Sequence, residues 1–332
     1  MKAIALITEE SQKFSLQEVI LPETSPDQVR IRTHYSGVSI GTEFALIRGK
    51  ISWGPYPLCT GYMGSGVIEE VGSAISRFKV GDSVFYRGNE SMELAGGGKV
   101  SCVSGTHCSH IVTRPDTTHG VDHLIEGVSM DVASMFTLPA VGLNGVNMAA
   151  PQVGQIAVVY GVGLIGLGVV AALAHRGCVV IAVDVNDRQL KIAQRLGADY
   201  LINVTAGDVD AAVRKITPDG ADIVFECTGI GACVNPAIAL CKLRGSFVWQ
   251  GNYGSNVDLQ FLAAHVRQLR MFFPCDDGHQ PCRRAVIKNM ANGALPWGET
   301  ITHRVDSTDA PAFYDRIQAG EKEIVGAVIR WV

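Results

Sequence analysis

The sequence predicts an α/β protein in which a β-rich domain precedes a doubly wound parallel sheet that is covered by helices on both faces. The chain of 332 residues is too long for one ordinary core and suits two domains. Short β-like runs broken by glycine and proline fill its first part. Apolar runs that alternate with helix-like segments fill the later part. With 47% hydrophobic residues, 18% charged residues and 37 glycines, the composition is typical of a packed globular protein.

The β-rich domain is expected over residues 1–125. Its strand-like segments are rich in β-branched and apolar residues and are bounded by turn residues. The expected strands are residues 28–35, 64–71, 82–86 and 108–114. We expect residues 275–332 to complete this domain, with helices at 280–292 and 311–319 and strands at 300–304 and 323–332.

The second domain is expected over residues 126–274. Apolar runs of strand length alternate there with longer segments of helical pattern, which predicts parallel strands joined by crossover helices. The expected strands are residues 156–159, 179–183, 223–226 and 246–248.

Bulk properties exclude several classes of partner. The net charge is -4, and no stretch of lysine and arginine is dense enough to bind a phosphate backbone, so nucleic acid is not an expected partner. No apolar signal core opens the chain, and glycines interrupt the longest apolar stretch at residues 156–174, so no export signal and no membrane span are expected. Nine scattered cysteines indicate reduced thiols and a cytoplasmic location.

A glycine motif follows the first strand of the second domain. Gly161, Gly163 and Gly166 have the spacing G-x-G-x-x-G, and Leu164 and Ile165 lie where the next helix begins. The first glycine suits a tight turn, the second allows the backbone to approach a pyrophosphate, and the third allows helix and strand to pack closely. The helix N-terminus offers amide donors to the phosphates. A glycine-rich turn that binds nothing is the alternative.

An acidic residue supports dinucleotide binding over that alternative. Asp184 ends the next strand about 20 residues after the glycines, where a carboxylate accepts hydrogen bonds from the adenosine ribose. The same charge repels a 2′-phosphate, so the sequence favours NAD(H) over NADP(H). Arg188 is nearby and is interpreted as a solvated helix residue or a cover for the adenine.

With these motifs in place, nearly the whole chain resembles the medium-chain dehydrogenase/reductase superfamily, whose members join a GroES-like catalytic domain to a Rossmann domain. The matching segments combine the glycine motif with five further stretches, namely residues 35–39, 57–72, 78–84, 225–229 and 301–304. The resemblance implies that Cys227, Thr228 and Gly229 line the cofactor site. It gives Gln250, Gly251 and Asn252, after the next strand, a similar position near the nicotinamide.

The zinc ligands of related enzymes have no counterparts here. Ser39 and Ile40 stand near the position of a ligating cysteine, and Tyr62 stands in place of a ligating histidine. The segment 136–142, where a third ligand is expected, has no Cys, His, Asp or Glu. Since a catalytic zinc needs three such ligands, no metal is predicted. Two other groups, Cys102 with His107, Cys108 and His110, and Cys275 with His279 and Cys282, lack the spacing of a closed zinc site.

Without a metal, hydrogen-bond donors must polarise the substrate oxygen. The candidate catalytic residues are Tyr62, Thr42, Glu43 and Ser39. Tyr62 is the first choice as proton donor, the alternative being that its ring only fills the vacated space. Thr42 resembles a hydroxyl that relays protons in zinc alcohol dehydrogenases. Glu43 is either a base or a carboxylate that pairs with Arg48 or a backbone amide and fixes its loop.

The sequence therefore predicts a zinc-independent, NAD-dependent dehydrogenase that acts on a secondary alcohol or ketone of a cyclic, polyol or sugar-like small molecule. It resembles the branch that includes bacteriochlorophyllide a dehydrogenase and the bi-domain oxidoreductases. One alternative is a metal-free quinone or enoyl reductase of the same superfamily, against which Asp184 argues. Another is a non-catalytic dinucleotide-binding protein. The resemblance also implies a homodimer or homotetramer.

Overall fold

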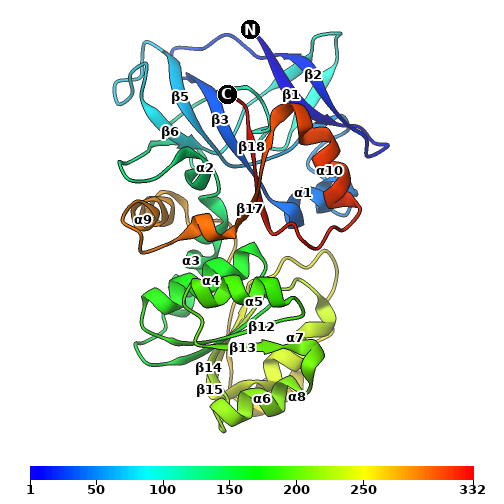
Figure 1. Cartoon of the computed structure of the whole chain (residues 1–332), viewed down its shortest axis with the longest axis vertical. Helices are drawn as coiled ribbons and strands as arrows, with labels where there is room; N and C mark the ends of the chain where they lie inside the picture. The colour runs from blue at the N-terminus through cyan, green and yellow to red at the C-terminus, as the bar shows by residue number, and fades with distance from the viewer. The chain divides into compact units, whose positions relative to one another are not determined.

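The computed structural model describes residues 1–332 and divides them into two compact units (Figure 1). The first unit comprises Met1–Phe136, Met290–Asn292 and Ile301–Val332, and the second comprises Thr137–Asn289 and Gly293–Thr300. None of the helices is long and apolar enough to cross a membrane.

The first unit is built from a small closed barrel and a larger sheet. The barrel has the strand order β1-β2-β7-β8-β4, and the sheet has the order β10-β6-β5-β3-β18-β17, with β9 also paired to β3. The bounds are β1 Lys2–Thr8, β2 Phe14–Ile20, β3 Val29–Val38, α1 Ile40–Ile47, β4 Leu58–Cys59, β5 Gly64–Val71, β6 Ser83–Tyr86, β7 Met92–Leu94, β8 Lys99–Cys102, β9 His110–Thr113, β10 Val121–His123, α2 Met130–Ala133, β17 Ile301–Asp306, α10 Ala310–Gln318 and β18 Gly326–Arg330.

The last strand, β18, pairs with β3 from the N-terminal part of the chain. The pairing is antiparallel, with Ala327 opposite Val38 and Arg330 opposite Tyr35. Both of these strands and α10 contribute apolar side chains to one core with α1, which includes Phe44. This core fixes α1, which carries two of the candidate catalytic residues.

The second unit contains one six-stranded parallel sheet with the order β13-β12-β11-β14-β15-β16. In Figure 1, α4 and α5 lie on one side of these strands and α6 and α7 on the other. The bounds are α3 Thr137–Ala149, β11 Ile156–Tyr160, α4 Leu164–His175, β12 Val179–Asp184, α5 Asp187–Arg195, β13 Tyr200–Asn203, α6 Val209–Ile216, β14 Ala221–Glu226, α7 Gly231–Ala239, β15 Cys241–Trp249, α8 Phe261–Val266, β16 Arg270–Phe272 and α9 His279–Ala291.

The predicted fold class is confirmed: a GroES-like β-rich unit is joined to a doubly wound parallel sheet of the Rossmann type. The four strands expected in the sheet are β11, β12, β14 and β15, and the sheet reverses its strand order between β11 and β14. In such sheets, ligands bind outside the carboxyl ends of the strands at that reversal.

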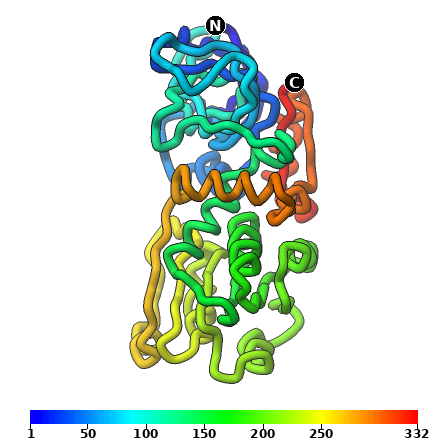
Figure 2. The backbone as a smooth tube through the Cα atoms, turned by 90° about the vertical axis from the view of Figure 1, so that its left-hand side faces the viewer, coloured from blue at the N-terminus to red at the C-terminus, as the bar shows by residue number.

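The compact units differ from the predicted domain boundaries at three places. Residues 126–136 fall in the first unit, and residues 275–289 and 293–300 fall in the second. Figure 2 shows the backbone continuing from β16 into α9. The side chain of Asn144 on α3 holds this segment by donating to the carbonyls of Cys275 and Asp276 at 3.0 and 3.2 Å.

Candidate functional site

The glycine turn after β11 has the geometry of a phosphate-binding loop. Gly161 has φ +90°, which favours glycine, and Gly163 is the N-cap of α4. A Cβ on Gly166 would lie 2.0 Å from the Gly161 carbonyl oxygen, whereas a Cβ on Gly163 would meet nothing within 4 Å. Leu164 and Ile165 form the first turn of α4. Their position leaves free backbone amides at a helix N-terminus, which suits an anion.

Asp184 is tied to this turn by hydrogen bonds. Its Oδ2 accepts the backbone amide of Val162 at 2.8 Å, and its Oδ1 accepts the amide of Asn186 at 2.9 Å. Arg188 is exposed near the start of α5, where Asn186 caps its amide. A carboxylate has about four acceptor positions, so these two bonds orient Asp184 and leave acceptor capacity for a ribose.

The remaining predicted cofactor residues follow β14 and β15. The Cys227 amide donates to the Tyr160 carbonyl at 2.8 Å, which places residues 227–229 beside the glycine turn. Gly251 packs so closely that a Cβ there would lie 2.5 Å from the Gly229 nitrogen. Gln250 Nε2 donates to the Val141 carbonyl at 3.4 Å, and Asn252 approaches Gly229. The carboxyl ends of adjacent parallel strands therefore gather these segments at one edge of the sheet.

A buried carboxylate that the sequence analysis missed holds this edge together. Glu226 Oε1 accepts the Thr228 amide at 3.0 Å and also the Thr228 hydroxyl, and Glu226 Oε2 accepts the Tyr253 hydroxyl. The Glu226 carbonyl accepts the Gly251 amide at 2.8 Å. The available signal was an acidic residue directly after the apolar run Ile223–Phe225.

In the first unit, Glu43 lies at the centre of a fully buried polar network. Its Oε1 accepts the Ser39 amide at 2.7 Å. Its Oε2 accepts the Thr60 hydroxyl at 2.8 Å and the Tyr314 hydroxyl at 2.7 Å, and it lies 2.9 Å from His107 Nε2. Four groups therefore surround the carboxylate, one at Oε1 and three at Oε2.

The same network sets the charge of Glu43. Burial raises the pKa of Glu43, but the charge and hydrogen bond of His107, the Ser39 amide and the Tyr314 hydroxyl outweigh burial and hold that pKa below its ordinary value. Glu43 is an ionised, buried carboxylate that accepts the Ser39 amide. This contact fits the interpretation that Glu43 fixes its loop. Glu43 therefore lacks the open face that a base for a substrate requires.

The other ring nitrogen of His107, Nδ1, also has a hydrogen-bond partner. This nitrogen lies 2.8 Å from Ser36 Oγ, and that hydroxyl accepts the indole N–H of Trp331 at 2.9 Å. The network thus connects β3, α1, α10 and the C-terminal residues. Sequence reasoning missed His107 and Tyr314 as partners of Glu43 because they lie 64 and 271 residues away along the chain.

The structure brings Tyr62 and Ser39 together next to this network. The Tyr62 hydroxyl donates to Ser39 Oγ at 2.5 Å, and the guanidinium carbon of Arg87 lies 5.2 Å from the centre of the Tyr62 ring. Burial raises the pKa of Tyr62, opposed by hydrogen bonds with Ser39 and Thr42 and by the charge of Arg87. The phenol is therefore protonated at neutral pH and is a donor rather than a base.

The β-rich first unit and the glycine turn of the parallel sheet in the second unit form the arrangement of a nucleotide-binding oxidoreductase. The alcohol dehydrogenase GroES-like domain family matches residues 25–123, and the zinc-binding dehydrogenase family matches residues 165–291. The chain belongs to the medium-chain dehydrogenase/reductase superfamily.

Individual relatives agree with this assignment. Sorbitol dehydrogenase from Halalkalibacterium halodurans is 27% identical, over 97% of each chain. Two solved structures share the fold over 99% of each chain: a putative zinc-binding dehydrogenase from Sinorhizobium meliloti 1021 bound to NADP (TM-score 0.85, 22% identity), and the alcohol dehydrogenase rspB from E. coli CFT073 in complex with NADH (TM-score 0.86, 19% identity).

The residues at the family's metal position do not fit a catalytic zinc. Such a site needs three ligands from cysteine, histidine or carboxylate. Here the two hydroxyls of Ser39 and Tyr62 bond to each other, and the next residue, Met63, offers only a thioether. In the segment 136–142, Thr137 carries the one polar side chain, and its hydroxyl is buried.

The two cysteine and histidine groups examined in the sequence serve structural contacts. His107 belongs to the Glu43 network, and Cys108 is buried in the barrel core. Cys282 Sγ accepts the Asn147 amide at 3.4 Å. Near it, ligand-type atoms of Asp276, Asp277 and His279 lie within 4.8 Å of one another, and Asp277 forms a buried ion pair with Arg283 at 2.7 Å.

Proposed function

We propose that the chain is a zinc-independent oxidoreductase that transfers a hydride between NAD(H) and a secondary alcohol or ketone of a polyol-like or sugar-like molecule. The observation that carries the proposal is the Tyr62–Ser39 hydroxyl pair at the position where related enzymes bind the metal. The sorbitol dehydrogenase similarity supports the polyol class of substrate. The cytoplasmic location and the homodimer or homotetramer stay predictions.

The edge of the parallel sheet that carries the glycine turn and Asp184, here called the nucleotide edge, supports NAD(H) as the cofactor. The amides at the start of α4 suit the pyrophosphate, and Gly163 leaves open space above the backbone there. Asp184, which already accepts the Val162 amide, is proposed to accept from the ribose hydroxyls, and its charge disfavours a 2′-phosphate. When bound, the cofactor supplies or accepts the hydride; the protein positions it and moves the proton.

Tyr62 is proposed as the proton donor. In the reductive direction, the carbonyl oxygen takes the Tyr62 proton as its carbon takes the hydride, and the product is an alcohol. Ser39 then donates its hydroxyl proton in a hydrogen bond to the phenolate, reversing the direction of the bond seen here. Arg87 over the ring stabilises the transient negative charge. Thr42 is proposed to relay a proton from solvent to the phenolate, which restores the phenol, and Glu43 to hold the loop that carries Ser39.

A Tyr62→Phe substitution tests the chemical role of the phenol. We expect kcat for ketone reduction to fall about 100-fold, the usual contribution of general acid catalysis, while NADH affinity changes less than about twofold. Tyr86→Phe is the matched control, because Tyr86 is also a buried tyrosine whose hydroxyl bonds to a hydroxyl, that of Thr33 at 2.9 Å. Unchanged kcat in Tyr62→Phe would show that the ring only fills space.

Metal analysis of the purified protein tests the zinc-independent part. We expect well under one zinc per chain by mass spectrometry, and turnover that survives a chelator. A stoichiometric zinc whose removal stops turnover would contradict the proposal. Activity on no alcohol or ketone of a broad panel, despite NADH binding, would instead favour a non-catalytic dinucleotide-binding protein.

A further inference from the structure

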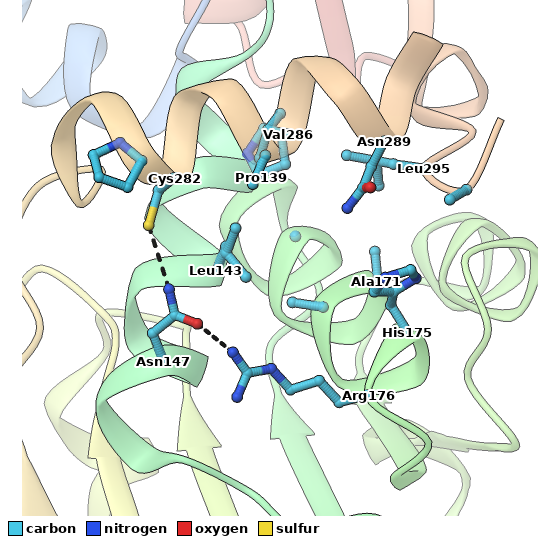
Figure 3. A pocket seen from close by; sticks show the side chains of 15 residues that line it. Pro139, Leu143, Asn147, Ala171, His175, Arg176, Cys282, Val286, Asn289 and Leu295 are labelled. Atoms are coloured by element: carbon cyan, nitrogen blue, oxygen red, sulfur yellow. Dashed lines mark hydrogen bonds between the residues drawn. The ribbon is translucent and has the colours of Figure 1, made fainter. Parts of the chain in front are cut away.

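A cavity of about 320 Å³ lies among three helices of the second unit (Figure 3). Pro139 and Leu143 of α3, Val286 of α9 and Leu295 from the segment after α9 give it an apolar wall. Its volume is about twice the ~150 Å³ of an engineered cavity that binds benzene. The space is therefore large enough for a small organic molecule.

Small side chains at close helix contacts create this space. α3 and α4 pack so tightly that a Cβ on Gly142 would lie 2.6 Å from the Gly168 carbonyl carbon. On the cavity side, α4 presents Ala171 and Ala172, and α9 presents Ala285. The close contact fixes the two helices, and the short side chains leave the volume between them and α9 unfilled.

One side of the cavity is polar and basic. Arg176 donates to the Asn147 Oδ1, and the Asn147 amide donates to Cys282 Sγ at 3.4 Å, so these three side chains form a row along that side, as Figure 3 shows. Arg176 is half-buried and forms no ion pair, and exposed His175 lies beside it. No aspartate or glutamate lines the cavity.

An apolar cavity with an unneutralised guanidinium at one side is complementary to an amphiphilic anion. Hydrogen bonds between arginine and a carboxylate are charge-assisted, and Arg176 has donors beyond the one that it gives to Asn147. The apolar wall contributes affinity through each methylene that it removes from water. A neutral apolar molecule gains only from the wall, and a cation is repelled.

We propose that this cavity is a second ligand site, which binds a small carboxylate with an apolar body, in the class of a medium-chain fatty acid. The carboxylate contacts Arg176, and the chain extends between Leu143 and Val286. The nucleotide turn lies at the opposite end of α4, about 18 Å away along this helix of 12 residues. Ligand and dinucleotide therefore occupy different sites of the same unit.

Calorimetric titration with sodium octanoate tests the proposal, with the full-length protein saturated with NADH. We expect one octanoate per chain with a millimolar or lower Kd, and binding of octan-1-ol at least about fivefold weaker, as loss of a half-exposed charge-assisted contact implies. Arg176→Gln should weaken octanoate binding about fivefold and leave the affinity for octan-1-ol unchanged. Arg195→Gln is the matched control, because Arg195 also ends a helix of this unit but lies outside the cavity lining.

Filling the cavity gives an independent test. Ala285→Leu on α9 and Ala171→Leu on α4 should each abolish octanoate binding, with thermal melting and NADH binding showing that the variant is folded; either variant suffices if the other fails to fold. The proposal is overturned if wild type does not bind octanoate at millimolar concentration. It is also overturned if folded filled variants bind it normally, or if Arg195→Gln weakens binding as much as Arg176→Gln.

Discussion

Replacing Glu43 with glutamine is expected to destabilise the first unit strongly. The carboxylate accepts from three donors, the Ser39 amide, the Thr60 hydroxyl and the Tyr314 hydroxyl, and also contacts the imidazole of His107. A glutamine of the same shape keeps one acceptor oxygen but points its NH2 group at groups that are themselves donors. Removing one partner of a buried ionic contact costs about 3–5 kcal/mol.

Tyr314→Phe provides a graded comparison. It removes the hydrogen bond to Glu43 Oε2 and the contact of the same hydroxyl with His107 Nε2 at 2.8 Å, and it leaves the other three partners of the carboxylate in place. Loss of a hydrogen bond to a charged group costs about 1.5–3 kcal/mol, so Tyr314→Phe should destabilise less than Glu43→Gln. The order of the two variants follows from counting the donors around the carboxylate.

The destabilisation should depend on pH. The network holds the Glu43 pKa below its ordinary value of 4.5, so its contribution to stability is present above that pH and is lost as pH falls through the lower, folded-state pKa. Glu43→Gln has no such group. The difference in unfolding free energy between wild type and Glu43→Gln should therefore persist from neutral pH to about 4.5 and shrink below it.

Urea unfolding followed by circular dichroism, repeated from pH 7 to pH 3, measures this difference. Glu93→Gln is the control, because Glu93 is an exposed carboxylate on β7 of the same unit and should change stability by less than about 0.5 kcal/mol. If Glu43→Gln is as stable as Glu93→Gln at pH 7, or if its deficit grows as the pH falls, the carboxylate is not the ionised centre of the network.

The nucleotide edge gives two further predictions. Asp184→Asn should weaken NADH binding about tenfold and reduce the preference for NADH over NADPH, because it removes the carboxylate proposed to accept from the ribose. Fluorescence titration with both cofactors measures the two affinities. An unchanged NADH affinity would contradict this role. Gly163→Ala should melt like wild type but lose NADH binding, because its Cβ meets nothing in the protein. Gly166→Ala should lower the melting temperature, because its Cβ would lie 2.0 Å from a carbonyl oxygen; equal melting of the two variants would refute this steric difference.

The sequence was sufficient for the fold because the decisive signals are local. The glycine spacing at Gly161 and the strand that ends at Asp184 lie within one strand, helix and strand unit, and β5 was expected at the residues where it is found. The short edge strand β13 was missed, since its apolar run is only three residues long, from Tyr200 to Ile202, and its first two residues are exposed. The Glu43 network was also missed, because hydrogen bonds between side chains far apart in the sequence produce no periodic residue pattern.

Ser39 connects the network to the proposed proton donor. Its backbone amide bonds to Glu43, and its hydroxyl accepts from Tyr62. The buried carboxylate therefore fixes the residue that orients the phenol, although it touches neither the phenol nor solvent. We propose that Glu43 acts in turnover by position rather than by proton transfer, through the loop that carries Ser39. In this proposal the loop, rather than a set of metal ligands, keeps the Tyr62 hydroxyl in a defined direction.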